Sequence, residues 1–151
     1  MTALELMTRL RGRGEEIEKL NEMLSIRRDA AMRVTSRPPD SVGGGGGGED
    51  SMARYAAQID ELLTSVARVK QLWQAEMDAC IKLSDRLQGT KKKLFYSYYA
   101  KSWTLYHISK HLGISEGYVR KLKVQVDGEL EKMTISPGML PEWYDSEATG
   151  R

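Results

Sequence analysis

The chain has 151 residues, a net charge of +2 and 40% hydrophobic residues, which allows one ordinary domain or two small ones. A single Phe and few β-branched runs argue against a sheet protein, and the single cysteine, Cys80, excludes an intramolecular disulfide and fits a reducing compartment. No apolar run approaches the roughly 20 residues that span a bilayer, and the start of the chain lacks the apolar core of a signal peptide. We therefore expect an intracellular protein without membrane contact.

Residues 1–34 predict an N-terminal helix. Residues 1–11 are weakly amphipathic, and Gly12 and Gly14 each cost about 1 kcal/mol relative to Ala inside a helix, so we expect a break or a frayed turn there. Beyond this point apolar residues follow coiled-coil spacing, at Ile17, Leu20, Leu24 and Ala31. Arg27 interrupts the spacing once.

Residues 35–50 predict a flexible linker. Pro38 and Pro39 end the first helix, and six consecutive glycines follow them. A phosphate-cradling loop would need Lys and Ser or Thr directly after the glycines, whereas Glu49 and Asp50 stand there and would repel phosphate. We therefore interpret the glycine run as a hinge between two helices.

Residues 51–89 predict one long coiled-coil helix. Its apolar positions alternate in steps of three and four, and Glu76 is the one charged residue among them. The positions are Met52, Tyr55, Ile59, Leu62, Val66, Val69, Trp73, Glu76, Cys80, Leu83 and Leu87. Because the first helix is too short to cover this stripe, we expect a homodimer that buries the remainder; packing of the C-terminal module against it is the alternative. Trp73 and Cys80 are then core residues.

Residues 90–133 predict a compact three-helix module. Its large side chains are Phe95, Tyr98, Tyr99 and Trp103. We expect them to form the core of the module, because it holds few other large residues. Stacking of these rings on exposed bases is the alternative.

Within this module, residues 104–126 predict two short helices joined by a tight turn, the helix-turn-helix form. Thr104 and Ser115 are suitable N-caps, and Gly113 stands where a chain leaving a helix often needs positive φ. The inward apolar stripes are Leu105, Ile108 and Leu112 in the first helix and Val119, Leu122 and Val126 in the second.

Positive charge is concentrated in the same region. Residues 90–123 hold eight Lys and Arg against one acidic residue, a local charge of +7, which leaves −5 for the rest of a chain whose net charge is +2. Such a block beside an acidic remainder favours a polyanionic partner, although a solvated helix surface would also account for it.

The segment TLYHISKHLGISEGYVRKL resembles the helix-turn-helix of sigma-factor region 4 and of phage regulators of the ArpU/RinA type. The matching residues are Thr104, Leu105, Ile108, Leu112, Gly113, Ile114, Ser115, Val119 and Leu122. The resemblance covers about residues 91–130; His107 and Ser109 depart from it, standing where an acidic residue and Ala are usual. It implies a phage or prophage transcription regulator in the cytoplasm of a bacterial host, with late-gene activation as one such role.

The expected partner is double-stranded DNA, with the helix 115–126 in the major groove. Arg120 can pair with guanine, and Glu116 can accept from cytosine. Other outward positions are Ser115, Gly117, Lys121 and Val124. Flanking phosphates are within reach of Tyr118, Lys123, Lys110, Lys91, Lys92 and Lys93.

No motif predicts an enzyme, a cofactor or a metal site. His107 and His111 have metal-ligand spacing, but no Cys or acidic cluster completes a ligand set. Two other functions compete with the regulator: a phage terminase small subunit, which also joins a helix-turn-helix to helical oligomerisation, and a coiled-coil adaptor or scaffold without DNA binding.

Residues 134–151 predict a flexible tail. Gly and Pro interrupt it, and termini of this composition fray. Its apolar residues are Met139, Leu140, Trp143 and Tyr144. They could dock on a partner such as RNA polymerase, or pack on the protein's own surface.

Overall fold

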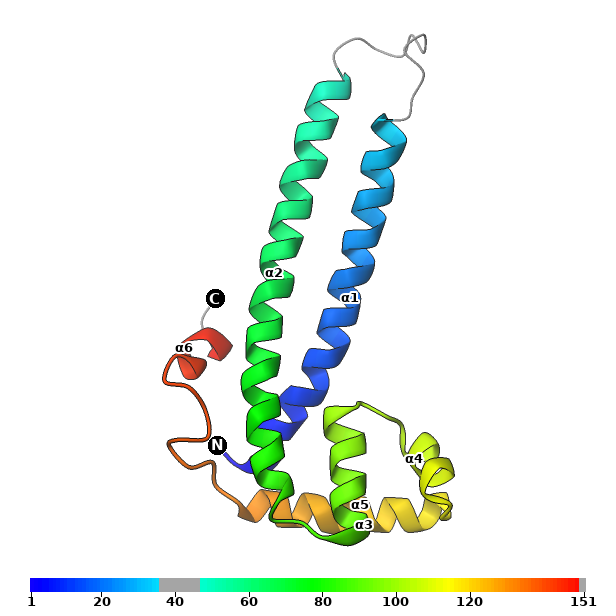
Figure 1. The fold of residues 1–151 in the computed structure, drawn as a ribbon, viewed down its shortest axis with the longest axis vertical. Coiled ribbons are helices and arrows are strands. Elements are labelled where there is room, and N and C mark those ends of the chain that lie inside the picture. The colour runs from blue at the N-terminus through cyan, green and yellow to red at the C-terminus, as the bar shows by residue number, and fades with distance from the viewer. Residues whose placement is uncertain (36–46, 150–151) are drawn as a thin grey trace. The chain divides into compact units, whose positions relative to one another are not determined.

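The computed structural model describes residues 1–35 and 47–149, with side chains over 1–34 and 51–148. Over these residues the protein is all-helical (Figure 1). The helices are α1 (Ala3–Thr35), α2 (Gly47–Ser84), α3 (Gly89–Phe95), α4 (Leu105–Leu112), α5 (Glu116–Lys132) and α6 (Tyr144–Thr149), and a π-helical turn, η1 (Tyr96–Ala100), follows α3. An isolated bridge between Thr2 and Thr134 is the one strand-like pairing in this part of the chain. The predicted all-α class is confirmed. Among the described helices, none combines the length and apolarity needed to cross a membrane.

The chain divides into two compact units whose limits differ from the predicted domains. One unit joins Met1–Glu15 to Gln71–Arg151, and the other is Glu16–Lys70. The first turns of α1 thus belong with the C-terminal helices. The predicted limits followed sequence order and could not show this association.

α1 is continuous where we expected a break, so that expectation was wrong. Its start is fixed by a capping box, in which Thr2 N–H donates to Glu5 (3.0 Å) and Glu5 N–H donates to the Thr2 hydroxyl (3.2 Å). The turns before Gly12 bury Ala3, Leu6, Met7 and Leu10 almost completely. Each such burial contributes about 1.5–3 kcal/mol for the larger side chains, which offsets the cost of two glycines.

Gly14 also has a local reason to be glycine. A Cβ at this position would lie 3.2 Å from the Ser102 hydroxyl oxygen, closer than ordinary van der Waals contact. The helix therefore approaches the segment between η1 and α4 closely at this point. Glycine permits that approach because it has no side chain.

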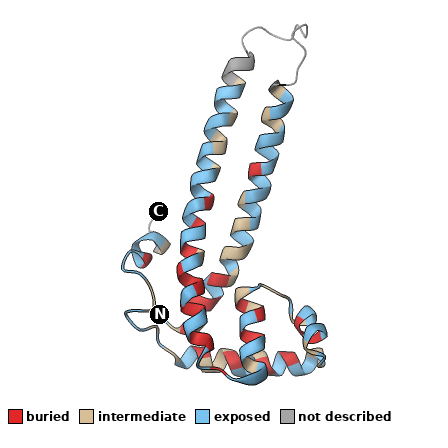
Figure 2. Cartoon of the chain, viewed as in Figure 1, coloured by how far each residue is buried: buried red, intermediate tan, exposed pale blue. Residues whose placement is uncertain are grey.

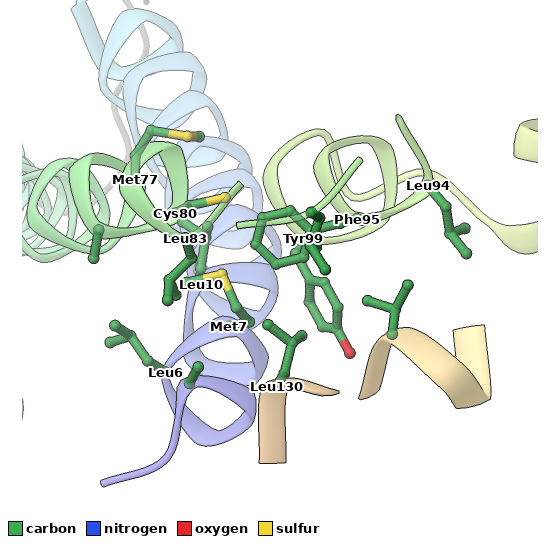
Figure 3. Close-up of a cluster of buried hydrophobic side chains, with 14 of the residues drawn as sticks. Leu6, Met7, Leu10, Met77, Cys80, Leu83, Leu94, Phe95, Tyr99 and Leu130 are labelled. Carbon is green, nitrogen blue, oxygen red and sulfur yellow. The ribbon is translucent and has the colours of Figure 1, made fainter. Parts of the chain in front are cut away.

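The core of the first unit joins α1, the end of α2, α3, η1 and α5 (Figures 2 and 3). Figure 3 shows Met7 and Leu10 beside Cys80 and Leu83, with Phe95 and Tyr99 on the adjoining side. The two rings are buried, which confirms the predicted core role for both and excludes base stacking on them. Burial raises the pKa of the Cys80 thiol to about 12, so it is an inert core residue.

The second unit buries the predicted stripes only in part. Leu24 of α1 and Val66 and Val69 of α2 are buried, whereas Met52 is exposed. α2 begins at Gly47, four residues earlier than predicted, and ends at Ser84, five residues earlier. The rest of the predicted linker, residues 36–46, lies outside the described residues.

Glu76, the charged residue of the α2 stripe, is fully buried in the first unit with two polar partners. Arg13 Nε donates to its Oε1 at 3.1 Å, and the Tyr144 hydroxyl donates to the same oxygen at 2.7 Å. Tyr144 is fully buried as well, so the predicted flexible tail is corrected: it packs on the protein's own surface. Burial raises the pKa of Glu76, and the hydrogen bond from Tyr144 and the charge of Arg13 oppose that rise.

This raised pKa predicts a pH dependence of folding. A carboxyl group with a higher pKa in the folded state stabilises the fold fully below the unfolded pKa, and this contribution is lost as pH rises through the folded pKa. Upward from about pH 4.5, wild type should therefore lose up to about 1.4 kcal/mol per pH unit relative to Glu76→Gln until Glu76 is ionised. Urea unfolding between pH 4 and 8 measures the difference.

Glu22→Gln is the control, because Glu22 is exposed. Its stability curve should run parallel to that of wild type. Parallel curves for wild type and Glu76→Gln would show that burial does not raise this pKa.

Candidate nucleic-acid interface

Three residues that the sequence predicted set the two ends of α4 and the start of α5. The Thr104 hydroxyl accepts from His107 N–H at 3.1 Å and so caps α4. Gly113 ends α4 in the left-handed region, at φ 68°. The Ser115 hydroxyl accepts from Tyr118 N–H at 3.2 Å and caps α5. Each cap satisfies a backbone N–H in the first turn of its helix that would otherwise lack a partner, so the starts of α4 and α5 are locally determined.

α5 divides into a buried face and an outward face. Val119, Leu122 and Val126 are buried, as predicted, and the helix continues to Lys132 with Leu130 also inside. Four outward positions share one side of its first half: Gly117, Arg120, Lys121 and Val124. Val124 is 73% exposed, so its side chain is uncovered on this face. This outward face is the surface that we call the α5 face.

Arg120 is paired on this face but remains available. Its Nη2 lies 2.9 Å from Glu116 Oε1, and its side chain is 67% exposed. An exposed pair four residues apart on a helix contributes only about 0.3–0.5 kcal/mol. Exchange of Glu116 for another acceptor therefore costs little.

Lys123, predicted to reach a flanking phosphate, has partners within the protein. Its Nζ lies 2.6 Å from Asp127 Oδ2 and 4.9 Å from the centroid of the Tyr98 ring. The Tyr99 hydroxyl donates to the other Asp127 oxygen at 2.5 Å. Burial and this carboxylate raise the pKa of Tyr99. Lys123 and Asp127 of α5 thus contact Tyr98 and Tyr99 of η1, so Lys123 contributes to packing rather than to the α5 face.

The remaining predicted contacts are distributed over several elements. Lys91 of α3 pairs with Glu129 at 3.0 Å, and Lys92 lies 3.6 Å from Asp85. Lys110 lies 5.3 Å from the ring centroid of Tyr106 on α4. Lys93, Tyr118 and Ser115 are exposed, and Glu116 is half-buried. Intramolecular pairs thus partly neutralise the positive block that the sequence predicted.

The two histidines pack on an aromatic ring. The His107 and His111 rings meet Trp103 edge-on, with centroid separations of 4.3 and 5.1 Å. In the described part of the chain, no group of three or more His, Cys, Asp or Glu side chains is arranged to hold a metal ion. Trp103 is half-buried, so its expected core role holds only in part.

Sequence reasoning missed Arg11, which anchors the segment before α4. Its Nη1 donates to the carbonyls of Tyr98 (2.5 Å) and Trp103 (3.0 Å), and its guanidinium carbon lies 3.9 Å from the Tyr98 ring centroid. No local signal in the sequence connects Arg11 to partners so far along the chain. The one indication in the sequence was that Arg11 directly follows the apolar residues of α1.

Comparison of the chain with models of known protein families, with curated proteins and with solved structures finds no match. The resemblance to sigma-factor region 4 and to phage regulators therefore stays a prediction.

The different surroundings of two lysines on α5 predict different effects of substitution. Lys123→Gln should destabilise the protein by about 1–2 kcal/mol, because Asp127 loses a charge-assisted hydrogen bond in a half-buried site. Lys121→Gln removes the same charge from an exposed position and should change stability by less than about 0.5 kcal/mol. Urea unfolding measures both; equal effects would refute the packing role of Lys123.

Proposed function

We propose that the protein is a sequence-specific DNA-binding transcription regulator, in which α4, the turn and α5 act as a helix-turn-helix. The observation that carries this proposal is the α5 face. On this face α5 presents the side chains of Arg120, Lys121 and Val124, while the opposite side of the helix is buried. A recognition helix needs this division, because the buried side fixes its position while the outward side meets base edges.

The side chains of the α5 face suit the chemistry of the major groove. Arg120 can donate two hydrogen bonds to O6 and N7 of guanine, and such a pair discriminates by about 1–3 kcal/mol against a wrong base. Val124 can contact a thymine methyl group. Gly117, without a side chain, lets the helix start come close to the DNA. Lys93, Lys110 and Tyr118 are exposed, and side chains of these types can contact phosphates without reading sequence.

Arg120→Ala tests the proposed readout. Against a duplex selected from genomic fragments, the variant should bind about 5- to 150-fold more weakly, and its preference for that duplex over an unrelated one should fall by a similar factor. Fluorescence anisotropy at two salt concentrations measures both. Arg27→Ala is the matched control, since Arg27 is an exposed arginine on the other unit and its loss removes the same charge.

Three results are possible. A loss of affinity and of duplex preference in Arg120→Ala but not in Arg27→Ala supports α5 as the recognition helix. Equal behaviour of the two variants would contradict it. Absence of any duplex binding by wild type at low salt would favour the adaptor or scaffold function instead.

The proposal includes a homodimer formed through the second unit. Large apolar side chains remain exposed there in the single chain, among them Met23, Ile26 and Leu63. Exposed apolar residues on this unit leave apolar surface that a further copy can bury, and two DNA-binding modules in one dimer would read two half-sites.

Light scattering tests the assembly. A mass of twice 17.1 kDa is expected. Ile26→Lys should shift the protein toward monomer, because a charge would enter the interface. A ring of about eight or more subunits would favour the terminase small subunit, and a monomer at all concentrations would contradict the dimer.

A further inference from the structure

A basic groove lies in the first unit, away from the side chains of the α5 face. It is bounded by α3, by η1 with the residue after it, and by the end of α4, and it has a volume of about 710 Å³. The charged and aromatic side chains that line it are Lys92, Lys93, Tyr96, Lys101 and His111. None of Arg120, Lys121 and Val124 lines this groove.

All the charged side chains that line the groove are lysines. Lys92 and Lys93 come from α3, and Lys101 follows η1. Among the described residues, no acidic side chain lines the groove; Asp85 lies 3.6 Å from Lys92 in an exposed pair, which contributes at most about 1 kcal/mol. Three ammonium groups around one hollow repel each other, so an anion between them stabilises the arrangement.

Aromatic rings hold part of this charge in position. The Lys101 ammonium lies 4.8 Å from the ring centroid of Trp103 and 5.7 Å from that of Tyr96. His111 meets the same Trp103 ring edge-on. Because the rings restrict Lys101 and His111, the binding of an anion costs less conformational freedom.

We propose that this groove is a phosphate-binding site that receives the sugar–phosphate backbone of the bound DNA. This inference rests on the proposed function for its partner, but not on the residues that read bases. Lysine binds phosphate as a point charge, and lysine and tyrosine side chains such as those of this groove are among the usual protein contacts to the phosphates of a duplex. The groove adds contacts without sequence preference to the selective contacts of the α5 face.

A charge-matched pair of triple variants tests the site. The groove variant carries Lys92→Gln, Lys93→Gln and Lys101→Gln. The control carries Lys19→Gln, Lys70→Gln and Lys82→Gln, all at exposed positions outside the groove. Both variants lower the net charge by the same amount, so a general field effect acts equally on them.

The measured quantity is the slope of log affinity for duplex DNA against log salt. Removal of one lysine–phosphate interaction should reduce the slope by about 0.9, so the slope of the groove variant should be smaller by about 2–3 while its base preference is retained. The control should keep the wild-type slope within about half a unit. Equal slopes for the two triple variants would overturn the proposal, and circular dichroism checks that both are folded.

A second measurement separates this proposal from the proposed function. Inorganic tripolyphosphate is titrated into the whole protein, and amide NMR shifts of Lys101, His111 and Leu112 are followed. Saturable shifts that disappear in the groove variant support the phosphate site even when wild type fails to bind any duplex, in which case only the proposed function fails. Shifts that do not saturate, or that persist in the groove variant, would overturn it.

Discussion

The segment that leads into α4 is tied to the first helix by one side chain, Arg11. The π-helical turn η1 and the segment after it leave two carbonyls, those of Tyr98 and Trp103, pointing at α1, and the Arg11 guanidinium satisfies both. The same guanidinium covers the Tyr98 ring. Ser102, between these two residues, takes a positive φ of 58°, a conformation that costs free energy in a non-glycine residue. The bonds from Arg11 hold that strained link in place, and α4 begins two residues after Trp103.

The charges of the first unit sort into two roles once their neighbours are known. Lys91 pairs with Glu129 and joins α3 to α5, whereas Lys123 pairs with Asp127 within α5 and contacts the Tyr98 ring of η1. The cations on the α5 face and in the basic groove have weaker, exposed pairs or aromatic neighbours, which cost little to exchange for a polyanion. Net charge therefore says less about binding than the burial of each pair does.

The sequence predicted what short-range chemistry determines. Thr104, Gly113 and Ser115 are local signals, because each acts within four residues, and all three have the predicted geometry. The association of residues 1–15 with the C-terminal helices was not predictable, since Arg11, Arg13 and Glu76 find partners far along the chain. Glu76 did interrupt an otherwise apolar stripe, but nothing local shows that Tyr144 donates to it. A helical period identifies a face and not the partner packed beside it, so the sequence did not show that Lys123 pairs with Asp127.

The most direct test of the central claim is crosslinking from the α5 face. Cys80 is buried and unreactive, so Val124→Cys provides a single site for a thiol-attached photocrosslinker. Efficient crosslinks are expected from position 124 to one specific stretch of a selected duplex, and background levels from the same probe at Ser25→Cys, an exposed position on the other unit. Equal crosslinking from the two positions, or none from position 124 while the duplex is bound, would contradict the claim that α5 enters the major groove of DNA.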